Sequence, residues 1–218
     1  MVAPYVVTAG LEGLIRAWQL MPDGKFNQVA LLEGHTRSVT SLLYCPPFLW
    51  SGSLDHTLRV WDVATGRCAG TIASGGRNPE GGGHTQAVAC LELIPAPAPD
   101  GESMVASGGA DGEVHLWSPS GQFLHACGHG GVLVTALRCF QDNRGGQMSL
   151  IIGLYDGRIV LRSCASMAIL FTIPSNVLNC RAVWGLVNIP NSGCFASAGE
   201  DGQLVIWQVS GPLQDAAT

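Results

Sequence analysis

The chain has 218 residues, long enough for one or two domains with a sizeable core. Hydrophobic residues make up 47% of it, which excludes a largely disordered chain. Charged residues are only 12%, and the net charge of −5 argues against a broad electrostatic footprint on nucleic acid or on an anionic membrane. The 29 glycines and 12 prolines are typical of many short strands joined by tight turns.

Several other classes of protein are disfavoured by local sequence. No apolar stretch approaches the roughly 20 residues of a transmembrane helix, and residues 1–5 lack the basic and apolar regions of a secretory signal. The eight cysteines form no Cys-x-x-Cys pair and mostly lie in apolar, strand-like contexts. We therefore expect reduced thiols, a cytoplasmic or nuclear protein, no metal ion and no cofactor.

In chain order, one motif recurs five times. It consists of small residues, then an acidic residue, then glycine or a similar turn residue, then an apolar alternation that ends near tryptophan. The five copies occupy residues 8–18, 51–61, 107–117, 152–162 and 197–207, and end at Trp18, Trp61, Trp117, Arg162 and Trp207. Their acidic residues fall at positions 12, 55, 111, 156 and 201, a nearly regular period that indicates an internal repeat.

A Gly-His pair precedes three of the motifs. These pairs are Gly34-His35, Gly83-His84 and Gly128-His129. Strand-like runs follow them, such as residues 38–44 and 87–93. Each repeat therefore reads as several short strands, with the acidic turn between two of them.

The period, the Gly-His pairs and the dipeptide Trp61-Asp62 resemble the WD40 repeat family over almost the whole chain. The resemblance implies an all-β fold, a β-propeller of WD repeats, as a single unit over residues 1–218. Elementary physics favours the same fold: an isolated four-stranded antiparallel sheet cannot bury both of its faces, whereas sheets stacked around an axis bury each other.

The resemblance also implies a hydrogen-bonded tetrad within a blade, made of His, Ser or Thr, Asp and Trp. Such a network satisfies polar groups whose burial would otherwise cost free energy. Two blades carry all four residues, and we expect their roles to be structural: His35, Ser51, Asp55 and Trp61 in one, and His84, Ser107, Asp111 and Trp117 in the next.

The other three blades depart from the tetrad, and we expect them to depend more on hydrophobic packing. The first has Thr8, Glu12 and Trp18 but no histidine; the fourth has His129 and Asp156, with Ile152 and Arg162 in place of Ser and Trp; the fifth has Ser197, Asp201 and Trp207, with Asn179 near the histidine position.

The two ends of the repeat array read as incomplete blades. Residues 5–9 read as the second strand of their blade, and residues 208–218 offer no convincing fourth strand. We therefore expect about five blades, three complete and two incomplete at the termini. One interpretation is a part of a larger propeller of about seven blades; the other is a five-bladed ring closed irregularly. An open arrangement would expose strand edges and invite pairing with another chain or oligomerisation.

No catalytic constellation assembles from the sequence. The Ser-His-Asp sets of the tetrads belong to a buried structural network, and no nucleophile elbow, P-loop or HExxH motif occurs. We therefore predict no catalytic residues and no enzymatic activity.

Binding is the favoured function, at the loops that converge around the central channel. In the resembling family, the residue before the turn acid and the residues at the start of the innermost strand point there. Because aromatic residues and arginines are typical interface anchors, we predict a partner site from Arg37, Leu54, Tyr155, Arg181 and Trp184. The competing interpretation is that Trp184 fills the core beside the channel and that the arginines are solvated or pair within the sheet.

The leading hypothesis is a non-catalytic scaffold or substrate-recognition module with a protein partner of unknown identity. An RNA-associated factor is the alternative, because the first two repeats look like the propeller part of plant CCCH zinc-finger WD-repeat proteins, although no zinc finger is present. The net charge of −5 weighs against nucleic acid as a partner. An enzyme is the third and least supported alternative, and no membrane partner is expected.

Overall fold

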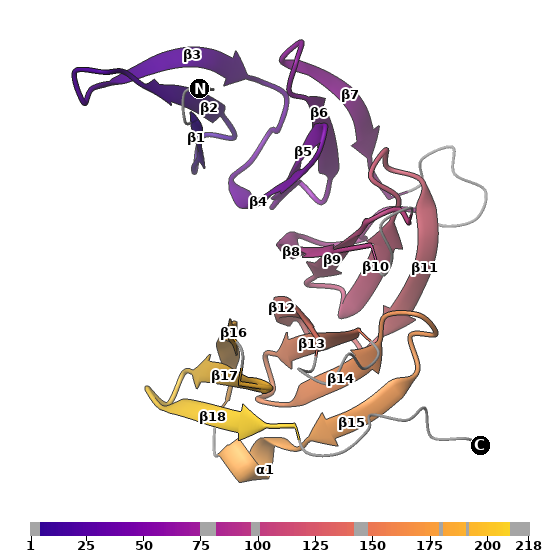
Figure 1. The fold of residues 1–218 in the computed structure, drawn as a ribbon. Coiled ribbons are helices and arrows are strands. Elements are labelled where there is room, and N and C mark those ends of the chain that lie inside the picture. The colour runs from indigo at the N-terminus through magenta and orange to yellow at the C-terminus, as the bar shows by residue number, and fades with distance from the viewer. Residues whose placement is uncertain are drawn as a thin grey trace.

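The fold is an arc of antiparallel β-sheets. The structure is a computed structural model, and it describes residues 5–74, 82–96, 101–141, 148–178, 181–190 and 192–209. Within these ranges the chain forms strands and one short helix, α1 (Ser175–Leu178), so the expectation of an all-β fold is confirmed. Figure 1 shows the sheets following one another in chain order along the arc, as the blades of a propeller do.

Each blade is a meander in which sequential strands are neighbours. The first blade contains β1 (Tyr5–Ala9), β2 (Ile15–Leu20) and β3 (Phe26–Leu32). The second contains β4 (Val39–Cys45), β5 (Phe48–Ser53), β6 (Leu58–Asp62) and β7 (Arg67–Ile72), and the third contains β8 (Val88–Ile94), β9 (Met104–Gly109), β10 (Glu113–Trp117) and β11 (Phe123–Gly128). The fourth contains β12 (Val134–Phe140), β13 (Ser149–Leu154), β14 (Ile159–Ser163) and β15 (Ile169–Ile173), and the fifth contains β16 (Val183–Ile189), β17 (Cys194–Gly199) and β18 (Leu204–Gln208).

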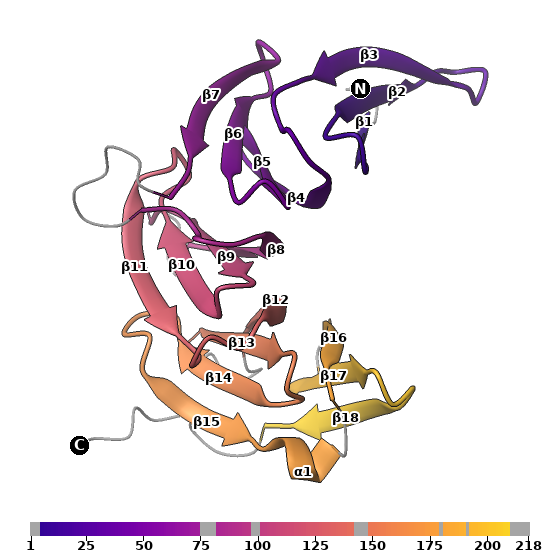
Figure 2. The same cartoon turned by 180° about the vertical axis from the view of Figure 1, so that it is seen from behind.

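The prediction of three complete blades between two incomplete ones is confirmed in the described part of the chain, where three sheets have four strands and two have three. The innermost strands β4, β8, β12 and β16 line the inside of the arc (Figure 1). Seen from either side, the first and fifth blades stand apart at the two ends of the arc (Figures 1 and 2). The described residues therefore form an open arc rather than a closed five-bladed ring. The tail that we expected to lack a fourth strand lies, from residue 210 on, outside the described residues.

The acidic turns have the geometry that the repeat predicts. In the third blade the Gly112 N–H donates to the Gly109 carbonyl at 3.2 Å, which closes a tight turn around Asp111. The residue after the acid adopts a left-handed conformation, which glycine tolerates best. In the second blade His56 takes this conformation with φ of 70°, so the Asp-His pair makes the same turn as the Asp-Gly pairs elsewhere.

Neighbouring blades meet through two kinds of face. We call the face that a blade turns toward the next blade its forward face, and the face toward the preceding blade its rear face. Trp50 and Val60 on the forward face of the second blade pack against Val105 and Trp117 on the rear face of the third. The corresponding faces pack at the next two joints, where Val114 and Leu116 meet Val134 and Leu150, and where Ile159 and Leu161 meet Val183 and Phe195.

Hydrogen bonds between the innermost strands reinforce these joints. The Thr40 hydroxyl lies 2.9 Å from the carbonyl of Gly52 in its own blade and 2.6 Å from that of Val88 in the next. Thr135 makes the same bridge from the fourth blade to the Val183 carbonyl. In the third blade the Cys90 thiol takes this role, 3.8 Å from the carbonyl of Val134.

The fourth blade compensates for its incomplete tetrad with apolar packing, as expected. Its second strand, β13, places Leu150, Ile151 and Ile152 at 0% exposure. Ile152 occupies the position of the tetrad serine and packs in the cluster that joins the third and fourth blades.

The Trp50→Ala variant should measure the strength of one joint. Trp50 is fully buried and its indole N–H donates to the Pro119 carbonyl at 3.1 Å. Removing the ring leaves a cavity and an unpaired carbonyl, so we expect a loss of about 3–5 kcal/mol in the free energy of unfolding. Urea unfolding followed by circular dichroism measures it. Tyr44→Ala is the matched control, because Tyr44 is exposed on the adjoining strand. Equal effects of the two substitutions would contradict the assigned packing.

Candidate partner-binding surface

The second blade contains the complete polar tetrad. The two nitrogens of His35 lie 2.8 Å from Asp55 Oδ2 and 2.7 Å from Ser51 Oγ. The Trp61 indole N–H donates to the same serine oxygen at 2.9 Å. The chain of contacts runs from the acidic turn through the interior to the third strand, so it ties the loop before β4 to β5 and β6.

The third blade repeats this arrangement. His84 Nδ1 lies 3.0 Å from each carboxylate oxygen of Asp111, and its Nε2 lies 2.8 Å from Ser107 Oγ. Trp117 Nε1–H donates to Ser107 at 2.8 Å. His115 stacks on His84 with ring centroids 4.2 Å apart. In both blades the histidine is buried and both of its ring nitrogens have polar partners.

The two tetrad carboxyls are held in their ionised form. Burial alone would raise the pKa of Asp55, but hydrogen bonds from Thr57, from His35 and from the backbone N–H of Thr36 outweigh it and lower the pKa to about 2. Burial likewise opposes ionisation of Asp111, and its interactions with His84 lower that pKa to about 2. These contacts stabilise the folded state as long as the carboxyls are ionised.

In the described residues, the first and fifth blades contain the tryptophan–hydroxyl hydrogen bond of the tetrad without the histidine contacts. Trp18 Nε1–H donates to Thr8 Oγ1 at 2.8 Å, and Trp207 Nε1–H donates to Ser197 Oγ at 2.9 Å. Asn179, which the sequence places near the missing histidine of the fifth blade, lies outside the described residues. The tryptophan–hydroxyl hydrogen bond is thus present in four blades, whereas the histidine contacts are present in two.

The fourth blade uses a different polar pair. Arg162 stands in place of tryptophan, and its Nε–H donates to His129 Nε2 at 3.2 Å. Burial, followed by the charge of Arg162, lowers the pKa of His129 to about 4, so the ring stays neutral and can accept this bond. The turn acid Asp156 pairs with Arg158 at 2.7 Å. The Gly-His pair of this blade therefore binds an arginine, which its sequence signature did not predict.

A repeated backbone contact brings the two kinds of predicted binding position together. The residue before each turn acid donates its N–H to the carbonyl next to the start of the innermost strand. These pairs are Leu54 to Ser38, Ala110 to Ala87, Tyr155 to Leu133 and Glu200 to Ala182, at 2.8–3.0 Å. The positions are therefore structurally equivalent from the second to the fifth blade, at the end of the molecule that carries the acidic turns.

Tyr155 and Trp184 form an exposed aromatic pair on this surface. Tyr155 comes from the turn of the fourth blade and Trp184 from the start of β16 in the fifth. Their ring centroids are 5.9 Å apart and the rings are nearly perpendicular, at 83°. Tyr155 is 49% exposed and Trp184 is 56% exposed. The alternative that Trp184 fills the core is therefore wrong, because more than half of its surface is accessible.

The other predicted residues lie on two parts of the same end. Arg37 is exposed, and its guanidinium donates to the Leu54 carbonyl at 3.3 Å, so these two residues meet in the second blade. Arg181 is exposed beside β16, two residues before Val183. The structure thus groups Arg37 with Leu54, and Tyr155 with Trp184 and the neighbouring Arg181. The expected pairing of an arginine within the blade holds for Arg37.

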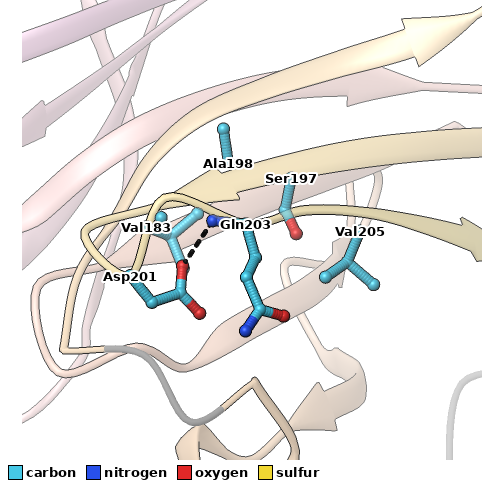
Figure 3. A pocket seen from close by; sticks show the side chains of 7 residues that line it. Val183, Ser197, Ala198, Asp201, Gln203 and Val205 are labelled. Atoms are coloured by element: carbon cyan, nitrogen blue, oxygen red, sulfur yellow. Dashed lines mark hydrogen bonds between the residues drawn. The ribbon is translucent and has the colours of Figure 1, made fainter.

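Two hollows in the described part of the chain were considered as binding sites on the grounds of their volume and lining: one lies in the fifth blade and one between the first and second blades. Figure 3 shows a small one in the fifth blade, where the Gln203 N–H donates to Asp201 at 3.0 Å beside Ser197. Its free volume of about 10 Å³ corresponds to roughly one water molecule, too little for a substrate. A groove of about 680 Å³ runs between the first and second blades, lined by Val7, Leu49 and Trp61 among others.

Sequence reasoning missed this groove. Val7 occupies in the first blade the position of Trp50 in the second, because Thr8 and Ser51 are equivalent tetrad positions. The size of this one side chain does not explain the groove, because Ala106 holds the same position in the third blade and is fully buried.

In the ranges that the structure describes, no three His, Cys, Asp or Glu side chains are placed to hold a metal ion together. The seven described cysteines are free, and three of them, Cys45, Cys139 and Cys164, are buried. None of the described helices has the length and apolar character required to cross a bilayer.

Comparison with known proteins decides the family. The family model described as "WD domain, G-beta repeat" matches residues 26–62, 77–118 and 171–208, which together exceed half of the chain. The chain belongs to the WD-repeat family. The matches include the motifs that end at Trp61, Trp117 and Trp207, whereas the divergent motif of the fourth blade, residues 152–162, lies outside them.

Similar proteins include two much longer ones. Mitochondrial division protein 1 of Aspergillus clavatus is 34% identical over 96 residues, which are 43% of this chain and 12% of that protein. Telomerase protein component 1 of Mus musculus is 25% identical over 209 residues, 93% of this chain and 7% of that protein. The chain thus spans about a tenth of the length of these curated relatives.

A solved structure also matches most of the arc. The crystal structure of the computationally designed Ika8 protein superposes with a TM-score of 0.72 at 25% identity, and it covers 94% of this chain and 55% of that one. Because the superposition includes nearly every strand, it supports the arrangement of the five blades as well as the fold of each blade.

The low pKa of the two tetrad carboxyls predicts how the stability of the fold depends on pH. Their folded pKa of about 2 lies below the ordinary value of 3.8. Their stabilisation is therefore present above about pH 4 and is lost as the pH falls toward 2, by about 2 kcal/mol for each carboxyl. The folded pKa of His129 is also lowered, to about 4. Because the unfolded chain binds the proton first, the free energy of unfolding decreases as the pH falls from about 6.5 to 4.

Asp55→Asn should therefore lower the free energy of unfolding at pH 7 and flatten its decline between pH 4 and pH 2. Urea titrations at a series of pH values measure both effects. Asp23→Asn is the control, because Asp23 is an exposed carboxyl outside the tetrads. A decline as steep in Asp55→Asn as in the wild type would show that the tetrad carboxyl does not carry this dependence.

Proposed function

We propose that this chain is a protein-interaction module, and that its partner binds at the end of the blades that carries the acidic turns. WD repeats are generally non-catalytic interaction scaffolds, and the tetrads here hold their Ser, His and Asp side chains in buried structural contacts. The further proposal is the site itself, centred on Tyr155 and Trp184, with Arg37, Leu54 and Arg181 around it.

The single observation that carries the site is the exposed pair of Tyr155 and Trp184. Large aromatic side chains are enriched among the residues that dominate binding energy, and they lose little conformational entropy on binding. Both residues stand on an ordered framework: the Tyr155 N–H is bonded to the Leu133 carbonyl, and Val183 next to Trp184 is buried. The pair is thus exposed and preorganised.

The surroundings supply the polar part of an interface. Arg181 lies three residues before Trp184 and is exposed, and Glu200 occupies in the fifth blade the position of Tyr155 in the fourth. Aromatic residues surrounded by charged ones match the usual anatomy of a protein interface, with an apolar centre and a polar rim. The arginine and the glutamate would select a partner with both charges near its apolar anchor.

The test uses the double variant Tyr155→Ala plus Trp184→Ala. Wild-type and variant chains are immobilised and exposed to an extract of the source organism, and the bound proteins are quantified by mass spectrometry. A partner of the wild type is then purified and titrated. We expect the double variant to bind it at least about 30-fold more weakly, since an aromatic anchor contributes 2 kcal/mol or more.

The matched control is Tyr44→Ala plus Phe171→Ala. These two aromatic side chains are exposed to a similar degree but lie at the far end of β4 and on the outer strand β15. The control should bind the partner as the wild type does. Unchanged binding by a folded Tyr155/Trp184 variant would remove the site assignment, and a salt-sensitive shift of RNA by the wild type would favour the RNA-associated alternative.

A further inference from the structure

The histidine of the fourth blade has a buried donor without an acceptor. His129 is 6% exposed, and its Nε2 accepts the Nε–H of Arg162 at 3.2 Å. Burial and the charge of Arg162 lower the pKa of His129 to about 4, so the ring is neutral and its one proton is on Nδ1. In the part of the chain that the structure describes, this buried Nδ1 has no hydrogen-bond partner. A buried N–H without an acceptor is unfavourable.

The complete tetrads show where the acceptor belongs. In the second and third blades the equivalent nitrogen lies 2.8 Å and 3.0 Å from the carboxylate of the turn acid, Asp55 and Asp111. The turn acid of the fourth blade is Asp156, and the residues on either side of it make the same backbone hydrogen bonds as in those two blades. Rotation of the Asp156 side chain would therefore carry its carboxylate toward His129 with little movement of the backbone.

An arginine holds Asp156 away from His129. The Asp156 carboxylate accepts the backbone N–H of Arg158 at 3.1 Å and the Nε–H of the same residue at 2.7 Å. The backbone contact has counterparts in both complete tetrads, where the donors are Thr57 and Glu113. Neither of those residues is a cation, so the side-chain ion pair is specific to the fourth blade. Both of its side chains are more than a third exposed, and water weakens their attraction.

The loop before β12 removes a further donor from the acid. In the complete tetrads the backbone N–H of the threonine after the histidine also donates to the carboxylate. Three residues separate the histidine from the innermost strand in those blades, whereas four, residues 130–133, do so in the fourth. The first two of them are glycines with φ of 71° and 73°, a left-handed conformation. Among the described residues this loop makes no hydrogen bond to Asp156, whose carboxylate is left with one side-chain donor on Arg158 or one on His129.

The charges near the aromatic pair indicate the chemistry of a group that could compete for Arg158. Arg158 lies three residues after Tyr155, and Arg181 lies three residues before Trp184. Each aromatic residue of the proposed binding site thus has an arginine close to it in the chain. Because complementary charges favour binding, an acidic side chain of the partner fits this part of the surface.

We propose, on the basis of the binding site proposed above, that an acidic side chain of the protein partner binds Arg158 and displaces Asp156, whose carboxylate then accepts the Nδ1–H of His129. The exchange leaves Arg158 paired and gives the buried donor an acceptor, so one hydrogen bond is gained. It also ties the turn that carries Tyr155 to the loop before β12, as the tetrads do in the second and third blades. Arg158 is thus a partner contact, and Asp156 is a positioning residue.

The first arm of the test needs no partner. Arg158→Thr introduces the residue that stands at this position in the second blade, so Asp156 should turn to His129. Proton NMR of the chain with 15N-labelled histidine follows each imidazole Nδ1–H near neutral pH. His35 and His84 are internal references, because their Nδ1–H groups donate to carboxylates. The His129 resonance should move downfield toward these two in Arg158→Thr, and should not do so in Arg158→Thr plus Asp156→Ala.

The second arm titrates the purified partner of the wild-type chain. Arg158→Thr should weaken binding about 10-fold and reduce its salt dependence, because the contact with the partner's carboxylate is lost. Asp156→Ala leaves Arg158 without its internal competitor and should bind at least as tightly as the wild type. Addition of the partner to the wild type should shift the His129 Nδ1–H downfield. Arg67→Thr, at an exposed position on β7, is the matched control and should bind as the wild type does.

Three results would overturn the proposal. One is a His129 resonance that stays at its wild-type position in Arg158→Thr. Another is an equal shift in Arg158→Thr with and without Asp156, which would show that a different group accepts the proton. The third is unchanged affinity of folded Arg158→Thr for the partner. The first arm is measured without a partner, so its failure is distinct from failure of the proposed binding site, which the Tyr155/Trp184 variant tests.

Discussion

The structure depends on one constraint: a four-stranded β-sheet with two apolar faces must have a neighbour on each face. Every blade between the ends satisfies this constraint by packing its forward face against the rear face of the next, with bulky residues such as Trp50 and Trp117 at the joint. The tetrads, the turns and the loop surface are arranged around these joints. Because each blade contacts only its neighbours, the stability of the arc is close to a sum over blades and joints.

Two kinds of interaction stabilise the individual blades: a polar hydrogen-bond network and apolar packing. In the second and third blades, a buried network of His, Ser, Asp and Trp connects the loop before the blade to its second and third strands. In the fourth blade an isoleucine replaces the serine, and an arginine binds the histidine instead. Packing can thus replace the polar network while the fourth blade keeps the same order of strands as its neighbours.

The period of the motif was sufficient to predict the number of blades and the two incomplete ends, and the resemblance to WD repeats implied both complete tetrads, because a repeat imposes the same contacts wherever the same residues recur. Contacts that break the repeat could not be predicted in this way. The bond from Arg162 to His129 and the groove between the first and second blades are contacts of this kind. Tyr155 and Trp184 could be predicted as exposed positions, but their contact joins two blades and needed the three-dimensional structure.

The groove beside Val7 has a consequence for the way in which the molecule opens. The first blade has three described strands, half of a tetrad and a groove at its joint, whereas the second blade has a complete tetrad and Trp50. In a linear array of units, thermal opening begins at the unit with the weakest joint and stops where the next one is strong. We therefore expect the first blade to separate from the second before the second blade separates from the third, at a joint remote from Tyr155 and Trp184 in the fourth and fifth blades.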